Sequence, residues 1–178
     1  MTPREDSTIN RKEQILDAAA ALFAEFGYYK TTTAEVARAI GVTQPYVFHF
    51  FKSKEALYLA VLERASSLIM QAFATVDAPA ELLSERMGQA FVELLDDHRN
   101  EIMLVMMAYA TPEPAIREYT RREFDLVFER VKERFEIAGI TEPERSAQLF
   151  FGYGLIISMS EALNLPKLCP WNERRGKK

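Results

Sequence analysis

The chain has 178 residues, 48% of them hydrophobic, and a formal net charge of −4. This length allows one large domain or a small domain joined to a larger one, and the apolar content is ample for a buried core. The negative charge argues against a protein that coats nucleic acid nonspecifically. The single cysteine, Cys169, excludes an intrachain disulfide and a multi-cysteine zinc site, and we interpret it as incidental rather than as a redox switch.

The first expected element is a helix that Asn10 can cap and that Gly27 ends. The polar residues 1–8 before it are expected to be disordered. The apolar residues of this first helix recur at helical spacing: Ile15, Leu16, Ala19, Leu22, Phe23 and Phe26.

The sequence favours a cytoplasmic protein. No positively charged segment followed by an apolar run opens the chain, so no secretion signal is predicted. The longest weakly polar run, residues 147–160, is shorter than the ~20 apolar residues that span a bilayer. We therefore expect a cytoplasmic protein with no membrane partner.

Residues 31–55 predict two short helices joined by a tight turn. Thr32 and Glu35 form a capping-box pattern at the start of the first helix. Gly41 stands where a helix C-terminus favours a residue that tolerates positive φ, and Pro45 lies in the first turn of the second helix, where its missing N–H costs nothing. This pattern is typical of a helix-turn-helix, whose second helix enters the major groove of DNA.

The charge distribution fits a focused DNA contact rather than a broad basic face. Residues 1–54 hold seven basic and six acidic side chains, whereas residues 55–178 hold fifteen and twenty. A near-neutral N-terminal unit is therefore attached to an acidic body.

The remainder of the chain is predicted to be helical throughout. Ser53 can cap a long helix, and breaks in the periodicity fall at residues 77–79, 98–100 and 111–114. A last long helix begins at Pro143 and ends near residue 163. No strand alternation, internal repeat or low-complexity segment is present, so the predicted architecture is all-α.

The chain therefore divides into three parts. Residues 9–54 are predicted to form a three-helix DNA-binding domain, and residues 55–165 a larger helical body joined to it by the long helix. Residues 166–178, with two prolines and a basic end, are expected to be an irregular tail.

The order of a helix, the run TTTAEVARAIGVTQPYVFHFFKSKEALYLAV and about a hundred residues of helical body resembles the TetR family of bacterial transcriptional regulators. The resemblance is specific across residues 15–61 and architectural afterwards. It implies a homodimer that binds a palindromic operator, usually as a repressor. It also implies release of the DNA when a small molecule occupies the body.

The resemblance also implies which residues contact DNA. Glutamine can hydrogen-bond adenine through two edges, and proline or tyrosine carbons can pack against a thymine methyl. The alternative for these side chains is ordinary solvent exposure on a short helix. By position, the phosphate contacts are Thr33, Thr43 and Lys54, and the residues facing the groove are Gln44, Pro45 and Tyr46.

The chain departs from the common family pattern in and after the turn. Gln44 and Pro45 replace the usual Lys-Gly, and Phe48-His49-Phe50-Phe51 stands where a Tyr-Tyr-His-Phe-like run is common. This shifts one polar contact by a residue. We interpret His49 as a phosphate contact and Phe50 as packing inward, with Val47 and Phe51 in the core.

Methionine and aromatic side chains in the body favour a ligand cavity, because methionine adapts to varied apolar ligands. Few charges interrupt these segments, so a small, largely apolar ligand is predicted. The alternative is that the same residues form plain core. The candidate pocket residues are Met70, Phe91, Leu95, Met103, Met106, Met107, Tyr109, Phe128, Phe150 and Tyr153.

The last two long helices have more apolar surface than one partner helix would cover, which favours a four-helix dimer interface. Glycines within a helix cost stability unless helices approach closely there. The alternative is burial against the same subunit. The candidate interface residues are Phe124, Phe135, Phe151, Gly152, Gly154 and Ile157.

An enzyme has little support in the sequence, and no cofactor or metal is predicted. His49 and His98 belong to different parts of the chain, and Asp97 and His98, being adjacent, point about 100° apart on a helix. No nucleophile motif, phosphate-binding glycine loop or zinc spacing occurs. The leading prediction is a ligand-responsive, dimeric repressor. One alternative is a helical module that binds a protein partner and keeps a vestigial DNA motif, and another is an enzyme on a helical scaffold.

Overall fold

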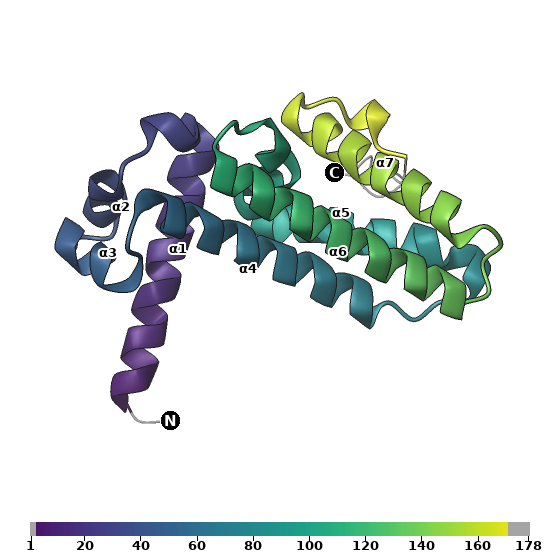
Figure 1. The fold of residues 1–178 in the computed structure, drawn as a ribbon, viewed down its shortest axis with the longest axis horizontal. Coiled ribbons are helices and arrows are strands. Elements are labelled where there is room, and N and C mark those ends of the chain that lie inside the picture. The colour runs from purple at the N-terminus through teal and green to yellow at the C-terminus, as the bar shows by residue number, and fades with distance from the viewer. Residues whose placement is uncertain (1–2, 171–178) are drawn as a thin grey trace.

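The chain is all-helical in the computed structural model, which describes residues 3–170, and these residues contain no strand. The predicted fold class is confirmed. In Figure 1 the two short helices α2 and α3 lie beside α1 at one end, and α4 runs from them into a body of long helices. The elements are α1 (Pro3–Lys30), α2 (Thr33–Ala39), α3 (Gln44–Phe50), α4 (Lys54–Thr75), α5 (Ala80–Met107), η1 (Ala108–Ala110), α6 (Pro114–Ile137), α7 (Pro143–Ala162) and η2 (Pro166–Leu168).

The start of α1 corrects the sequence prediction. The helix begins at Pro3, so Asn10 lies inside it rather than capping it, and the predicted disorder before Asn10 is wrong from Pro3 onward. A proline at the first helical position and the acidic residues Glu5 and Asp6 just after it favour a helix start. Near the other end, Gly27 interrupts the helix with a non-helical backbone of φ 77°, and a short helical segment continues from it to Lys30.

The helix-turn-helix forms as its local sequence predicts. The Thr32 hydroxyl accepts a hydrogen bond from the Glu35 amide at 3.2 Å, and the Thr32 amide donates to the Glu35 carboxylate at 2.8 Å. The hydrogen bonds from Thr32 lower the pKa of Glu35. Gly41 adopts φ 68°, and the next amide, of Val42, donates back to Ala37 O at 2.9 Å. The turn therefore closes α2 and starts α3 without strain.

The long helix α4 begins where predicted, since the Ser53 hydroxyl accepts from the Ala56 amide at 3.0 Å. The break expected at residues 98–100 is a kink rather than an end. His98 has φ −128° and ψ 35°, and α5 continues through the apolar segment after it. The breaks at residues 77–79 and 111–114 are confirmed.

One buried core extends from the small N-terminal unit into the body. It includes Phe23 of α1, Val36 of α2, Val47 of α3 and Leu62 of α4, and it continues through the later helices. Helix α4 therefore contributes to both ends of this core. No described helix is long and apolar enough to cross a membrane. The predicted irregular tail includes residues 171–178, which lie outside the described residues.

Candidate DNA-binding surface and ligand cavity

Helix α3 buries one side and exposes the residues predicted to contact DNA. Val47 is fully buried, and Phe51 just after the helix is nearly so, as predicted. The exposed residues include Thr43 and Pro45 at the start of the helix and His49 in its last turn. The predicted contact residues on the rest of this surface, Gln44 and Tyr46, are also exposed.

Gln44 is held by Thr33 across the turn. The Gln44 side-chain amide donates to the Thr33 hydroxyl at 2.7 Å, and Thr33 is only 5% exposed. The hydroxyl of Thr33 thus supports Gln44 and keeps its own O–H as a donor, and its phosphate contact stays a prediction. The arrangement leaves Gln44 its carbonyl oxygen and one N–H for a ligand.

Lys54 is turned toward the end of α1. Its ammonium donates to Tyr28 O at 2.9 Å and to Tyr29 O at 3.5 Å, and it lies 4.4 Å from the Tyr28 ring centroid. An ammonium has three N–H donors, so one remains for the predicted phosphate contact. Lys52, two residues earlier, is exposed.

Phe50 packs within the turn, whereas His49 stays exposed. The Phe50 ring lies 5.5 Å from that of Tyr46 and 5.3 Å from that of His49, and Phe50 is half-buried. Phe48, to which the sequence analysis gave no role, is 38% exposed on α3. It lies four residues after Gln44, so both side chains are on one face of the helix.

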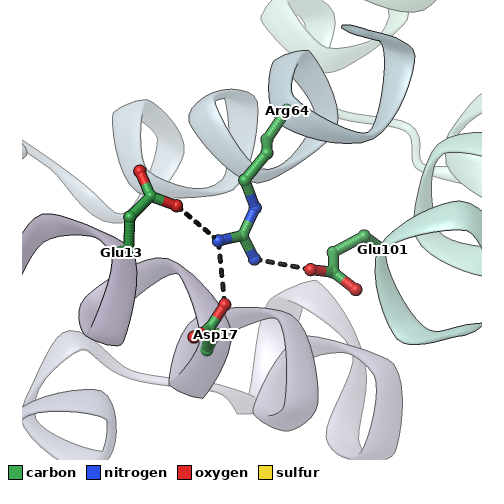
Figure 2. A network of polar contacts seen from close by, with 4 residues as sticks. All are labelled: Glu13, Asp17, Arg64 and Glu101. Atoms are coloured by element: carbon green, nitrogen blue, oxygen red, sulfur yellow. Dashed lines mark hydrogen bonds and ion pairs between the residues drawn. The ribbon is translucent and has the colours of Figure 1, made fainter. Parts of the chain in front are cut away.

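A charge network joins the N-terminal unit to the body, and sequence reasoning missed it. The Arg64 guanidinium of α4 lies 2.9 Å from Glu13 and 2.8 Å from Asp17, both on α1, and 2.6 Å from Glu101 on α5 (Figure 2). Burial lowers the pKa of Arg64, but hydrogen bonds to Glu13 and Asp17 and the charge of Glu101 outweigh it and raise the pKa. Glu101 is buried, so this arginine compensates its charge.

A cavity of about 60 Å³ lies between α4, α5, α6 and α7. Three of the ten predicted pocket residues, Phe91, Met106 and Phe150, line it. Its other lining residues are Ser66, Ile69, Phe73, Gly88, Val105, Glu123, Phe124, Val127, Phe151, Gly154 and Ile157.

The other predicted pocket residues lie elsewhere. Leu95 is buried core, and Phe128 packs its ring 5.5 Å from that of Phe151. Tyr153 is exposed. The remaining four line separate surface hollows: Met70 between α4 and α6, Met103 and Met107 between α1 and α5, and Tyr109 beside α6.

Ser66 and Glu123 are the two polar side chains in the cavity lining. The Tyr119 hydroxyl donates to the Ser66 hydroxyl at 3.5 Å. Burial raises the pKa of Tyr119 to about 12, with Glu123 and Glu63 adding to the rise and Ser66 and Arg122 opposing it. Sequence reasoning missed Glu123, although it lies one helical turn after Tyr119 and therefore on the apolar face of α6.

The predicted dimer residues are mostly turned inward. Phe135 and Ile157 are buried within the chain, while Phe124, Phe151 and Gly154 line the cavity. Phe124 and Phe151 are half-buried, so only part of each side chain remains open to a partner. Gly154 approaches Met106 of the same chain, with 3.6 Å between its ideal Cβ position and Met106 Cε, whereas Gly152 meets nothing within 4 Å.

Four of the exposed apolar residues of α7, with Leu163 just after its end, form a stripe away from the buried face. Its members are separated by three or four residues, so they lie along one side of the helix. We call this the α7 stripe: Leu149, Tyr153, Ile156, Met159 and Leu163.

Residues 15–61 match the family described as "Bacterial regulatory proteins, tetR family". The chain is 44% identical over 57 residues to the HTH-type transcriptional repressor Rv1474c of Mycobacterium tuberculosis, a match covering 32% of this chain and 30% of that protein. It is 31% identical over 116 residues to the HTH-type transcriptional regulator YerO of Bacillus subtilis, covering 61% of this chain and 40% of YerO. The chain thus matches less than half the length of each of these curated relatives.

Solved structures share the fold over most of the chain. AibR in complex with isovaleryl coenzyme A and operator DNA has a TM-score of 0.68 at 22% identity, covering 84% of this chain and 86% of AibR. FadR from Bacillus subtilis with stearoyl-CoA has a TM-score of 0.73 at 18% identity, covering 90% and 92%. The SmeT–triclosan complex has a TM-score of 0.71 at 24% identity, covering 91% and 84%. At these identities the likeness concerns the fold.

Proposed function

This chain belongs to the TetR family of bacterial regulatory proteins, and from that premise we propose that it is a ligand-responsive repressor. It binds a palindromic operator as a homodimer in the cytoplasm, with residues 9–54 as its DNA-binding domain and residues 55–165 as its ligand-binding and dimerisation domain. The observation that carries the proposal is the exposed start of α3 within a complete helix-turn-helix.

Base recognition is assigned to Gln44, Pro45 and Tyr46. The bond from Gln44 to Thr33 fixes the amide before DNA arrives, which lowers the entropy lost on binding. The remaining carbonyl oxygen and N–H of Gln44 match the donor and acceptor edges of adenine. Thr43, His49 and Lys54 are assigned to the phosphate backbone, where contacts set position rather than sequence.

Homodimerisation is assigned to the α7 stripe. Apolar residues at this spacing on an exposed helical face suit packing against a second helix. A two-fold axis would place the same stripe of a second copy opposite it and would set the two α3 helices for two operator half-sites. This assignment replaces the inward-facing residues that the sequence suggested.

Release from DNA is assigned to a ligand in the cavity between α4 and α7. Ligand pockets usually measure ~300–1,000 Å³, so the cavity of about 60 Å³ must widen to accept a typical ligand. Ser66, Ile69 and Phe73 place α4 in its wall, so widening displaces the helix that carries Arg64. AibR, FadR and SmeT, with their named small molecules, are precedents for ligand binding in this fold.

Selection of bound sequences from random duplex DNA, at near-physiological salt, tests this function. An enriched palindrome is expected, since each protomer supplies one recognition helix. Absence of enrichment from folded protein would refute the repressor and favour the alternative, a helical module that binds a protein partner.

Replacing Tyr46 with alanine is expected to lower affinity for the selected operator about tenfold while leaving affinity for random DNA nearly unchanged. The tyrosine carbons would contact base edges, which only the operator presents in the right order. Titration of labelled operator and random duplexes measures the two affinities. Equal losses on both would show that Tyr46 contributes to general rather than specific binding.

Replacing Lys54 with alanine is expected to weaken binding to operator and random DNA alike and to reduce the slope of log affinity against log salt by about 1. A phosphate contact is present on every sequence, which accounts for the uniform loss. Lys52→Ala is the matched control, because Lys52 is exposed and makes no hydrogen bond to α1 in the described residues. Thermal unfolding of Lys54→Ala measures how much the loss of the hydrogen bonds to Tyr28 and Tyr29 destabilises the fold. This separates that effect from the loss of a DNA contact. An unchanged slope would remove Lys54 from the DNA contacts.

A further inference from the structure

The cavity between α4 and α7 has one ionisable side chain in its lining, Glu123 of α6. Its carboxylate makes no hydrogen bond or ion pair with any other described residue. The neighbouring Arg122 is directed at Glu118, at 3.9 Å. The cavity lining therefore carries a negative charge without a positive one, in a wall that is otherwise apolar except for Ser66.

The surroundings of Glu123 make the cavity unfavourable for a second negative charge. Tyr119 lies beside Glu123. Burial raises the pKa of Tyr119 to about 12, and Glu123 and Glu63 add to the rise while Ser66 and Arg122 oppose it, so the hydroxyl is neutral. A carboxylate or phosphate on a ligand would meet the same repulsion and would find no basic partner in the lining. A positive group would meet attraction, and it would also satisfy the Glu123 carboxylate.

We propose that this cavity binds a small apolar cation, whose protonated amine pairs with Glu123 and whose apolar part lies among the phenylalanine side chains. The proposal rests on the proposed function and specifies its ligand class. Glu123 is half-buried, so a bound cation would pair with a partly desolvated carboxylate, and the rings of Phe124 and Phe151 in the same lining can attract a cation through their faces. A ligand with one ring suits the size, since an apolar cavity of ~150 Å³ holds benzene and this cavity offers about 60 Å³ before widening.

Three compounds of equal size and different charge test the proposal: 2-phenylethylamine, 2-phenylethanol and phenylacetate. Calorimetric titration of the full chain near neutral pH is expected to show the amine binding about 10- to 100-fold more tightly than the alcohol, as a charged hydrogen bond would give. The carboxylate is expected to bind more weakly than either. Alcohol or carboxylate binding as tightly as the amine overturns the proposal, and so does failure of all three to bind.

Glu123→Gln keeps the size of the side chain and removes its charge, so the preference for the amine over the alcohol is expected to disappear. Asp125→Asn is the matched control, because Asp125 is exposed on the same helix and is not part of the cavity lining. Its preference should equal that of the wild type. A Glu123→Gln variant that still prefers the amine overturns the proposal. Operator binding without ligand, measured on the same samples, reveals separately whether the proposed DNA function fails.

Discussion

Replacing Arg64 with alanine is expected to lower the free energy of unfolding by about 3–5 kcal/mol, the usual cost of leaving a buried charge without its partner. The cost comes from Glu101, whose side chain is 12% exposed and loses a contact of 2.6 Å. Glu13 and Asp17 are more exposed, so water can replace the arginine at these two groups. Urea or thermal unfolding monitored by circular dichroism measures the difference.

Arg121→Ala is the control for this prediction. Arg121 also pairs with a carboxylate, Glu118, at 2.9 Å, but the two side chains are 67% and 55% exposed. An exposed pair contributes about 0–1 kcal/mol, so this variant should remain close to the wild type. Equal losses for Arg64→Ala and Arg121→Ala would contradict the special position of Arg64 between α1, α4 and α5.

The effect of the charge network on stability can be separated from its effect on regulation by a double variant. A double variant, Arg64→Met with Glu101→Leu, removes both buried charges, and such replacements are often neutral for stability. If Arg64 transmits the displacement of α4 to α1, this variant should still bind operator but respond less to ligand. Coupling of this kind is a free energy between two sites, so it is read from operator affinity with and without ligand.

Local motifs could be predicted from the sequence because a few neighbouring residues determine them. Thr32 with Glu35, Gly41 and Ser53 each depend on side chains or backbone within four positions, and all three behave as expected. The start of α1 was missed because the residues before Asn10 are polar and were expected to be disordered, although Pro3 and the acidic residues after it favour a helix start.

The parts of the site that depend on helix packing could not be predicted in the same way. Arg64 meets side chains that are far apart in the sequence, at positions 13, 17 and 101, and no local pattern links them. Gln44 reaches Thr33 only because the turn folds α3 against α2. Helix α7 is apolar on nearly all sides, so its sequence does not show which face lies inward. One predicted dimer residue of this helix, Ile157, is therefore on its buried face.

Replacing Met159 with aspartate tests that reassignment and is expected to separate the dimer. Met159 is 47% exposed, so the change costs the isolated chain little. In a two-fold interface through the α7 stripe, however, the aspartates of both copies would be buried close together without a partner. Analytical ultracentrifugation should show a folded monomer where the wild type is a dimer.

Loss of the dimer should in turn reduce operator affinity by about 10²–10⁴-fold, because the two half-sites are no longer bound by linked recognition helices. Affinity for a single half-site should change little, since α3 is unaffected. Leu82→Asp is the matched control: Leu82 is 41% exposed on α5, outside the α7 stripe. A Met159→Asp protein that stays dimeric, or a Leu82→Asp protein that dissociates equally, would place the dimer interface on another surface of the body.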